Sequence, residues 1–128
     1  MQVAHIALWT NDLDRAAAFW REHFNASVGE AYHSKRREGF ISHFVTLESG
    51  PALELMTLPG LVDKPPREDS RTGWAHIAVS LGTVEAVDKM VSALEPGGAV
   101  VHAARWTGDG FYEAVIADPD GNLIEITS

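Results

Sequence analysis

Two histidines and two glutamates are the residues of this chain whose types and spacing point to chemistry. Glu54 follows His5 by 49 positions, and Glu125 follows His76 by the same 49 positions. A histidine or glutamate inside an apolar strand is costly to bury unless it is paired or bound to a cation. Two imidazoles and two carboxylates suit a borderline divalent ion such as Zn²⁺, Ni²⁺, Co²⁺, Mn²⁺ or Fe²⁺. We therefore predict that these four residues are the ligands of one metal ion.

The surroundings of these residues are repeated at an offset of 71 positions. Ala4-His5-Ile6-Ala7 recurs as Ala75-His76-Ile77-Ala78, and Leu53-Glu54-Leu55 corresponds to Ile124-Glu125-Ile126. Self-similarity at a long fixed period indicates a duplicated supersecondary unit. The sequence between the copies, 59–73, contains three prolines and a run of charges, which is typical of a linker. We predict one domain over 1–128, with modules at 1–58 and 74–128 joined by this linker.

Hydrophobic periodicity predicts the same order of elements in both modules, β-α-β-β-β. Apolar residues at three- and four-residue steps indicate an amphipathic helix over 13–24, and Thr83 begins a second helix that ends near Leu94. Alternating or continuous apolar runs predict the strands at 3–9, 27–32, 39–47, 52–58, 74–81, 99–106, 111–117 and 122–127. The fold class is therefore α+β, with two tandem βαβββ modules and eight strands.

The alternation of side chains along a strand decides which residues share a face. The face of the first strand opposite His5 is wholly apolar, with Ile6 at its centre, and suits packing against a helix. The same rule places each of the four ligand candidates on the side of its strand away from the helix. Apolar residues on or beside these ligand faces are predicted to line a substrate-binding cleft: Trp9, Met56, Leu58, Trp74 and Leu123.

Composition limits the partners and the compartment. A formal charge of −8 disfavours binding to nucleic acid or to an anionic membrane, because both are polyanions. The chain has no cysteine, so a metal must be held by nitrogen and oxygen. No stretch has the length and apolar character of a membrane span or a secretion signal, and a cytoplasmic protein with a small-molecule substrate is expected.

The paired modules, the His-Glu-His-Glu quartet and the closing motif Asp118-Pro119-Asp120-Gly121-Asn122 together resemble the vicinal oxygen chelate superfamily. Within that glyoxalase/bleomycin resistance/dioxygenase group, the chain is most similar to glyoxalase I (lactoylglutathione lyase). The resemblance implies eight strands curled around a metal-binding cleft, and a homodimer whose modules pair within one chain or between two. It also implies one divalent ion per site, with Ni or Zn preferred.

The chemistry that the resemblance implies is that of a lyase or isomerase acting on a small carbonyl or hydroxycarbonyl compound. A carboxylate removes a proton from the carbon beside two substrate oxygens, and the resulting metal-bound enediolate is stabilised by the cation. By the position of the motif, Glu125 corresponds to the catalytic base and Glu54 to its counterpart.

Two positions depart from glutathione-dependent glyoxalase I. Those enzymes carry an arginine four residues after the first ligand and an asparagine four residues after the second, where this chain has Trp9 and Leu58. The replacements argue against glutathione in the physiological substrate. The basic run Lys35-Arg36-Arg37 is predicted to be a solvated loop, with the binding of an anionic tail as the alternative.

Other functions of the superfamily remain as alternatives. Extradiol dioxygenases and thiol transferases resemble one another in using two histidines and one glutamate, so the presence of Glu54 favours lyase or isomerase chemistry. A metal-dependent epimerase would use a related quartet. A bleomycin-resistance-like protein would bind a small molecule without metal and would have no need for four ligands.

Overall fold

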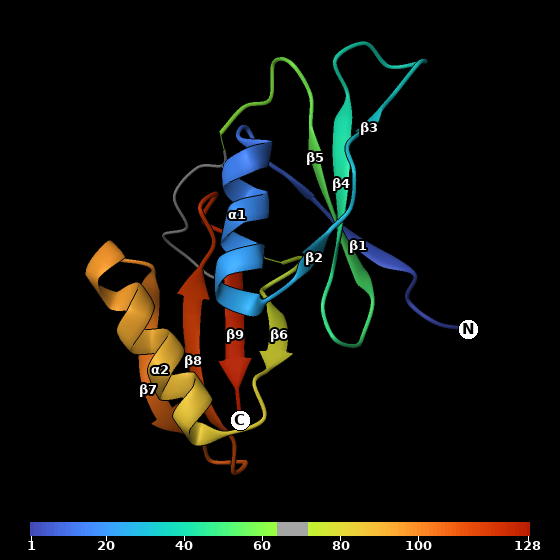
Figure 1. Ribbon diagram of the computed structural model, residues 1–128. Helices are drawn as coiled ribbons and strands as arrows, with labels where there is room; N and C mark the ends of the chain where they lie inside the picture. The colour runs from blue at the N-terminus through green and yellow to red at the C-terminus, as the bar shows by residue number, and fades with distance from the viewer. Residues whose placement is uncertain (64–71) are drawn as a thin grey trace. The chain divides into compact units, whose positions relative to one another are not determined.

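The computed structural model describes residues 1–63 and 72–128, and the chain divides into two compact units, Met1–Lys64 and Pro65–Ser128 (Figure 1). Each unit combines one α-helix with one sheet, which confirms the α+β class and the tandem βαβββ order. Most of the predicted linker, residues 64–71, lies outside the described residues. In the described part of the chain, neither helix has the length and apolar character needed to cross a membrane.

The first unit forms a sheet whose ladder runs in the order β1-β5-β4-β2, with β3 also paired to β4. Strand β1 is parallel to β5, and β5 is antiparallel to β4. After β1 the chain forms α1, returns to the sheet through β2 and β3, and then runs through β4 to β5, which lies beside β1. The elements are β1 (His5–Trp9), α1 (Leu13–Phe24), β2 (Ser27–Val28), β3 (Tyr32–His33), β4 (Ile41–Thr46) and β5 (Ala52–Thr57).

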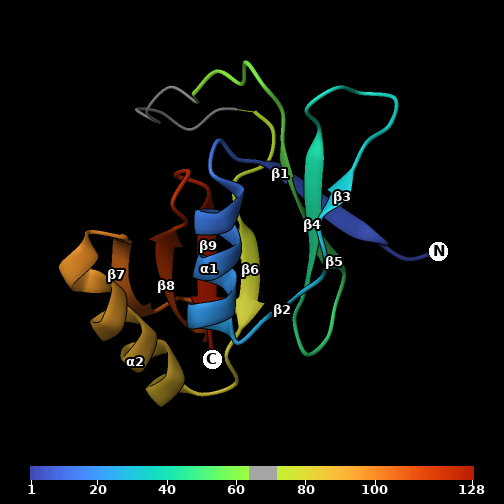
Figure 2. The ribbon, with the colours of Figure 1, turned by 45° about the horizontal axis from the view of Figure 1, so that its top comes forward.

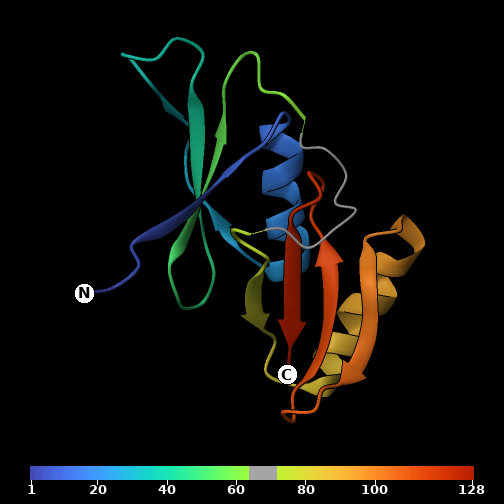
Figure 3. The same ribbon diagram turned by 180° about the vertical axis from the view of Figure 1, so that it is seen from behind.

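The second unit repeats this plan with the order β6-β9-β8-β7 (Figure 3). Strand β6 is parallel to β9, while β8 is antiparallel to both β9 and β7. The helix α2 packs against β7, β8 and β9. The elements are β6 (Ile77–Ser80), α2 (Val84–Leu94), the short 3-10 turn η1 (Glu95–Gly97), β7 (Val100–Trp106), β8 (Tyr112–Ala117) and β9 (Leu123–Thr127).

Both helices begin at a side-chain cap and bury one face. The Asp12 carboxylate accepts a hydrogen bond from the backbone N–H of Arg15 at 2.9 Å, and the Thr83 hydroxyl accepts one from Ala86 at 3.1 Å. Such caps satisfy N–H groups that a helix start leaves without a partner. The buried side chains are Ala16, Ala17, Phe19 and Trp20 in α1, and Val87 and Leu94 in α2.

The single strand predicted over 27–32 is instead a bulged edge made of β2 and β3 (Figure 2). Val28 pairs with Val45, and Tyr32 pairs with Ser42. Tyr32 is four residues after Val28, whereas Ser42 is only three residues before Val45, so the edge contains one residue more than β4. The extra residue is a β-bulge, and His43 Nδ1 donates a 2.7 Å hydrogen bond to the carbonyl of Gly29 within it. Two short segments therefore replace one continuous strand.

The strands β1 and β6 begin later than predicted. Strand β1 starts at His5 and β6 at Ile77, rather than at residues 3 and 74. In both sheets the parallel partner begins just after a turn, at Ala52 and at Leu123. His5 pairs with Ala52, the first residue of β5, so β5 offers no further residue to a longer β1. In the second unit the ladder begins one residue inside β9, with Ile77 paired to Ile124.

The turn before β9 is organised by the buried carboxylate of Asp118. Its Oδ1 accepts hydrogen bonds from the backbone N–H of Asp120 at 3.0 Å and of Asn122 at 2.8 Å, and its Oδ2 accepts one from the Asn122 amide at 2.9 Å. Burial raises the pKa of Asp118 above its ordinary 3.8, although the hydrogen bonds to Asn122 and Asp120 act in the opposite direction. Because the folded state holds this proton more tightly, the contribution of Asp118 to the unfolding free energy falls as pH rises above 3.8.

We expect Asp118→Ala to lower the free energy of unfolding by about 2–3 kcal/mol, because three hydrogen bonds worth roughly 1 kcal/mol each are lost. Denaturant unfolding measures the change. Glu48→Ala is the matched control, since Glu48 is an exposed carboxylate in the corresponding turn of the first unit. Equal midpoints for the two variants would show that the Asp118 turn adds nothing to stability.

Candidate metal-binding pairs

In the first unit, β1 and β5 bring His5 and Glu54 together. Ala52 is the Cα partner of His5, and Ala7 is the partner of Glu54, so the two side chains are diagonal neighbours on one face of the sheet. His5 Nε2 lies 3.6 Å from Glu54 Oε2. The carboxylate is the more enclosed group, with 17% of its side chain exposed against 45% for the imidazole.

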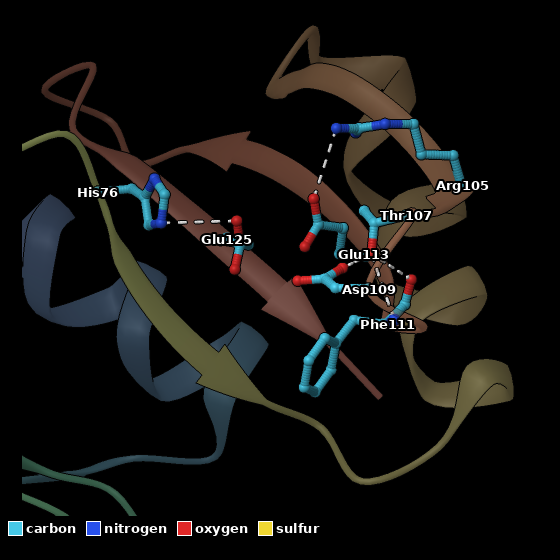
Figure 4. A network of polar contacts seen from close by, with 7 residues as sticks. All are labelled: His76, Arg105, Thr107, Asp109, Phe111, Glu113 and Glu125. Carbon is cyan, nitrogen blue, oxygen red and sulfur yellow. Dashed lines mark hydrogen bonds and ion pairs between the residues drawn. The ribbon is translucent and has the colours of Figure 1, made fainter.

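The second unit reproduces this arrangement with His76 and Glu125 (Figure 4). His76 directly precedes β6, and the Cα partner of Glu125 is Ala78, two positions beyond the histidine as Ala7 is beyond His5. His76 Nε2 lies 3.5 Å from Glu125 Oε2. The repeat in the sequence is thus a repeat of the register and of the distance between the two functional groups.

The separation within each pair suits two ligands of one metal ion. With metal–ligand bonds of about 2.1 Å and a tetrahedral angle between them, the two donor atoms lie roughly 3.4 Å apart. The nitrogen–oxygen distances of 3.6 and 3.5 Å are close to this value, and an imidazole with a carboxylate is a donor set that borderline divalent ions accept. Each pair therefore fits a metal ion.

Each unit supplies two of the four predicted ligands. Within residues 1–63 and 72–128, no group of three or more histidine, aspartate or glutamate side chains lies close enough to hold an ion. The structure brings His5 to Glu54 and His76 to Glu125, and the sharing of one ion by both pairs stays a prediction.

The ligand candidates lie on the less buried faces of their strands. In β5, Leu53 and Leu55 are buried on either side of Glu54, and in β9 Ile124 and Ile126 are buried on either side of Glu125. Helix α1 contacts β4 and β5, and α2 contacts β7, β8 and β9. The helix-packed apolar residues fix each strand, which leaves the glutamates on the opposite face.

The predicted substrate-binding residues lie on or beside these ligand faces. Trp9 is the Cα partner of Met56, and Met56 is two positions beyond Glu54 on β5, so all three share one face. The remaining residues are the half-buried Leu58 directly after β5, the half-buried Leu123 at the start of β9, and the exposed Trp74 before β6. Their contact with a substrate stays a prediction.

Two contacts beside the first pair were not predicted from the sequence. Phe44 is the Cα partner of Glu54 on β4, and its ring meets the His5 imidazole edge-on at 5.6 Å. Alternation along β4 was a signal that could have identified Phe44. Arg37 lies on an exposed loop, as predicted for the basic run 35–37, and its guanidinium also lies 5.5 Å from the centre of the Trp9 ring. No sequence pattern signals that contact.

A second acidic group shares the face of Glu125. Glu113 is the Cα partner of Thr127, two positions beyond Glu125 on β9. An ion pair of 3.4 Å joins it to Arg105, the residue opposite it on β7 (Figure 4). The loop between these strands is closed by the Thr107 hydroxyl, which hydrogen-bonds to the Asp109 carboxylate and the Phe111 backbone. The charge of Glu113, which lies on the same face as Glu125, is therefore balanced by Arg105.

A family model described as the Glyoxalase/Bleomycin resistance protein/Dioxygenase superfamily matches residues 2–126. The chain therefore belongs to this superfamily, which confirms the resemblance drawn from the sequence. A search of curated protein sequences found no match to the chain.

Solved structures share the fold at low sequence identity. A glyoxylase/bleomycin resistance protein/dioxygenase domain from a Frankia species has a TM-score of 0.81 at 18% identity, covering 99% of this chain and 96% of that one. Glyoxalase I from Zea mays has a TM-score of 0.78 at 21% identity, covering 98% of this chain and 44% of that longer one. Lactoylglutathione lyase from Agrobacterium tumefaciens has a TM-score of 0.65 at 23% identity, covering 98% and 91%. At these identities the likeness is one of fold.

Proposed function

We propose that the protein is a metal-dependent lyase or isomerase of the glyoxalase I type, acting on a small carbonyl or hydroxycarbonyl substrate. The proposed ligands of its one divalent ion per site are His5, Glu54, His76 and Glu125. One observation supports this most: both units carry a His–Glu pair at the same diagonal register, with the donor atoms 3.6 and 3.5 Å apart. A protein that only binds a small molecule has no physical reason to duplicate such pairs.

The bound ion would supply Lewis-acid stabilisation for two adjacent substrate oxygens. The proposed role of Glu125 is to accept the proton from the carbon beside those oxygens, with Glu54 as its counterpart. Glu125 Oε2 lies 3.5 Å from His76 Nε2, and Glu54 Oε2 lies 3.6 Å from His5 Nε2, which supports a shared ion for each carboxylate and its histidine.

The proposed substrate is apolar next to its reacting oxygens and is not a glutathione adduct. Trp9 and Leu58 stand where glutathione-dependent glyoxalase I carries an arginine and an asparagine, so two side chains that would hold the tripeptide are replaced by apolar ones. The proposed assembly is a homodimer in the cytoplasm, as expected from the resemblance and the sequence.

Proton exchange tests the proposed reaction. The protein reconstituted with Ni²⁺ or Zn²⁺ is expected to convert the hemithioacetal of methylglyoxal and benzyl mercaptan, with kcat/KM about tenfold or more above that of the glutathione adduct. Proton NMR in D₂O follows the exchange at the reacting carbon. If metal-loaded protein neither exchanges nor converts either adduct, the proposed chemistry is wrong.

A further inference from the structure

In the first unit, the side chain of Arg37 lies on aromatic rings beside the His5–Glu54 pair. The guanidinium carbon of Arg37 lies 5.5 Å from the centre of the Trp9 ring and 5.8 Å from that of Phe40. The Trp9 and Phe40 rings are perpendicular at 6.1 Å, and the Tyr32 ring lies 6.5 Å from that of Phe40. We refer to these four residues, Trp9, Tyr32, Arg37 and Phe40, as the Trp9 cluster.

The register of the sheet places the Trp9 cluster on the face that carries Glu54. Trp9 pairs with Met56, Met56 with Ser42, and Ser42 with Tyr32, which makes one row across β1, β5, β4 and β3. The neighbouring row contains Glu54 on β5. Residues two apart in a strand share a face and are separated by about 7 Å, so the cluster lies one such step from the candidate metal ligand.

The loop that carries Arg37 is held in place by its backbone. The Ser34 hydroxyl accepts hydrogen bonds from the N–H groups of Arg36 and Arg37 at 3.2 and 3.0 Å, and Ser34 N–H donates to the Phe40 carbonyl at 3.1 Å. Gly39 has a φ of +75°, and a Cβ there would lie 2.5 Å from the Pro59 ring. The loop therefore needs glycine at this point and presents Arg37 in a defined position.

Arg37 is available to an anion. Among the described residues its guanidinium has no carboxylate partner, in a chain with 18 acidic and 10 basic residues. Stacking on rings uses the faces of the guanidinium and leaves its N–H groups free to bind a carboxylate in two parallel hydrogen bonds.

A buried hydroxyl lies in the same row. Ser42 is 1% exposed, and its Oγ has no hydrogen-bond partner within the part of the chain that the structure describes. Its Cα partners, Met56 and Tyr32, border the Trp9 cluster. A buried hydroxyl without a partner is costly, and a polar ligand atom entering between these side chains would satisfy it.

We propose that the Trp9 cluster binds a carboxylate carried on an aromatic group of the substrate. The Arg37 guanidinium pairs with the carboxylate, and the Trp9 and Phe40 rings pack on the aromatic group. This inference rests on the proposed function for the reacting end of the substrate. It places the carboxylate about 7 Å from the oxygens held near Glu54, the distance between residues two apart on a strand. The substrate class is then an aromatic carboxylate with two adjacent oxygens at its other end.

Two matched chelators test the inference by calorimetry on Ni²⁺-loaded protein. Benzohydroxamate and 4-carboxybenzohydroxamate present the same two oxygens and differ only in the carboxylate. We expect the carboxylated compound to bind about tenfold or more tightly, as a charge-assisted bidentate pair allows. Arg37→Gln is expected to remove that preference and to change the affinity for benzohydroxamate less than about twofold, while the neighbouring Arg36→Gln leaves the preference intact. Equal binding of both compounds by the native protein, or a preference that survives Arg37→Gln, would overturn the inference.

A second titration separates this inference from the proposed function. Benzoate added to metal-free, ¹⁵N-labelled protein is expected to shift the indole N–H signal of Trp9 in the native protein and in Arg36→Gln, but not in Arg37→Gln. If this holds while the protein takes up no metal, the proposed enzyme function fails and the carboxylate site stands. If metal loads normally and benzoate shifts nothing, the carboxylate site is refuted and the enzyme function is unaffected.

Discussion

Replacement of Glu125 by glutamine is expected to lower kcat roughly 10²–10⁴-fold, the range that a general base contributes. A carboxamide has nearly the same shape as the carboxylate, and its oxygen keeps the lone pairs that a metal ligand needs. It is too weak a base to take a proton from carbon. The expected result is therefore a protein that retains most of its metal and loses its turnover, measured by steady-state kinetics together with metal analysis of the same sample.

Glu113→Gln is the demanding control for this variant. Glu113 lies two positions from the Glu125 row on the same face of the second sheet, and it is neutralised by Arg105 at 3.4 Å. We expect its replacement to change kcat less than about fivefold, because no proton transfer is assigned to it. If Glu125→Gln retains activity within tenfold of the native protein, or if Glu113→Gln is the more damaging change, the base is not Glu125.

Removal of either histidine is expected to weaken metal binding by about 100-fold or more, since loss of an outer-shell partner alone costs 10- to 100-fold. The duplicated register predicts effects of similar size for His5→Ala and His76→Ala. Competition with a coloured chelator gives the dissociation constants. His33→Ala serves as the control, because His33 is an exposed residue of β3 outside both pairs.

Unequal effects of the two histidine variants would carry information about the site. If only one of them weakened binding, the ion would be held by one unit, and the resemblance of the two pairs would be a relic of duplication. If His33→Ala weakened binding as much as either, the assignment of the ligands would be wrong.

The two His–Glu pairs could be predicted from the sequence because side chains alternate strictly between the two faces of a strand. Glu54 is flanked by Leu53 and Leu55, which must face the helix, so its own side chain has to lie on the other side of β5. The 49-residue spacing then selected its partner. The diagonal register of His5 and Glu54 could not be predicted, because the parallel pairing depends on where the preceding turn ends.

The sequence reasoning was wrong where the chain departs from regular geometry. The strand predicted over 27–32 ignored the bulge at Gly29, because alternation cannot show that one strand carries an extra residue. The basic run 35–37 is exposed, as predicted for a solvated loop, but the packing of Arg37 on a ring could not be predicted from its charge. The stacking of Arg37 on Trp9 depends on the turn from Ser34 to Phe40, which is a property of the three-dimensional structure.

The metal content of the purified protein after reconstitution with nickel, zinc, cobalt or manganese is the most direct test of this account. We predict one divalent ion per chain, because two pairs of two ligands share it. Two ions per chain would show that each His–Glu pair binds separately, which contradicts the single four-ligand site. No bound metal under any of these conditions would contradict the metal-dependent enzyme itself and would favour a protein that only binds a small molecule.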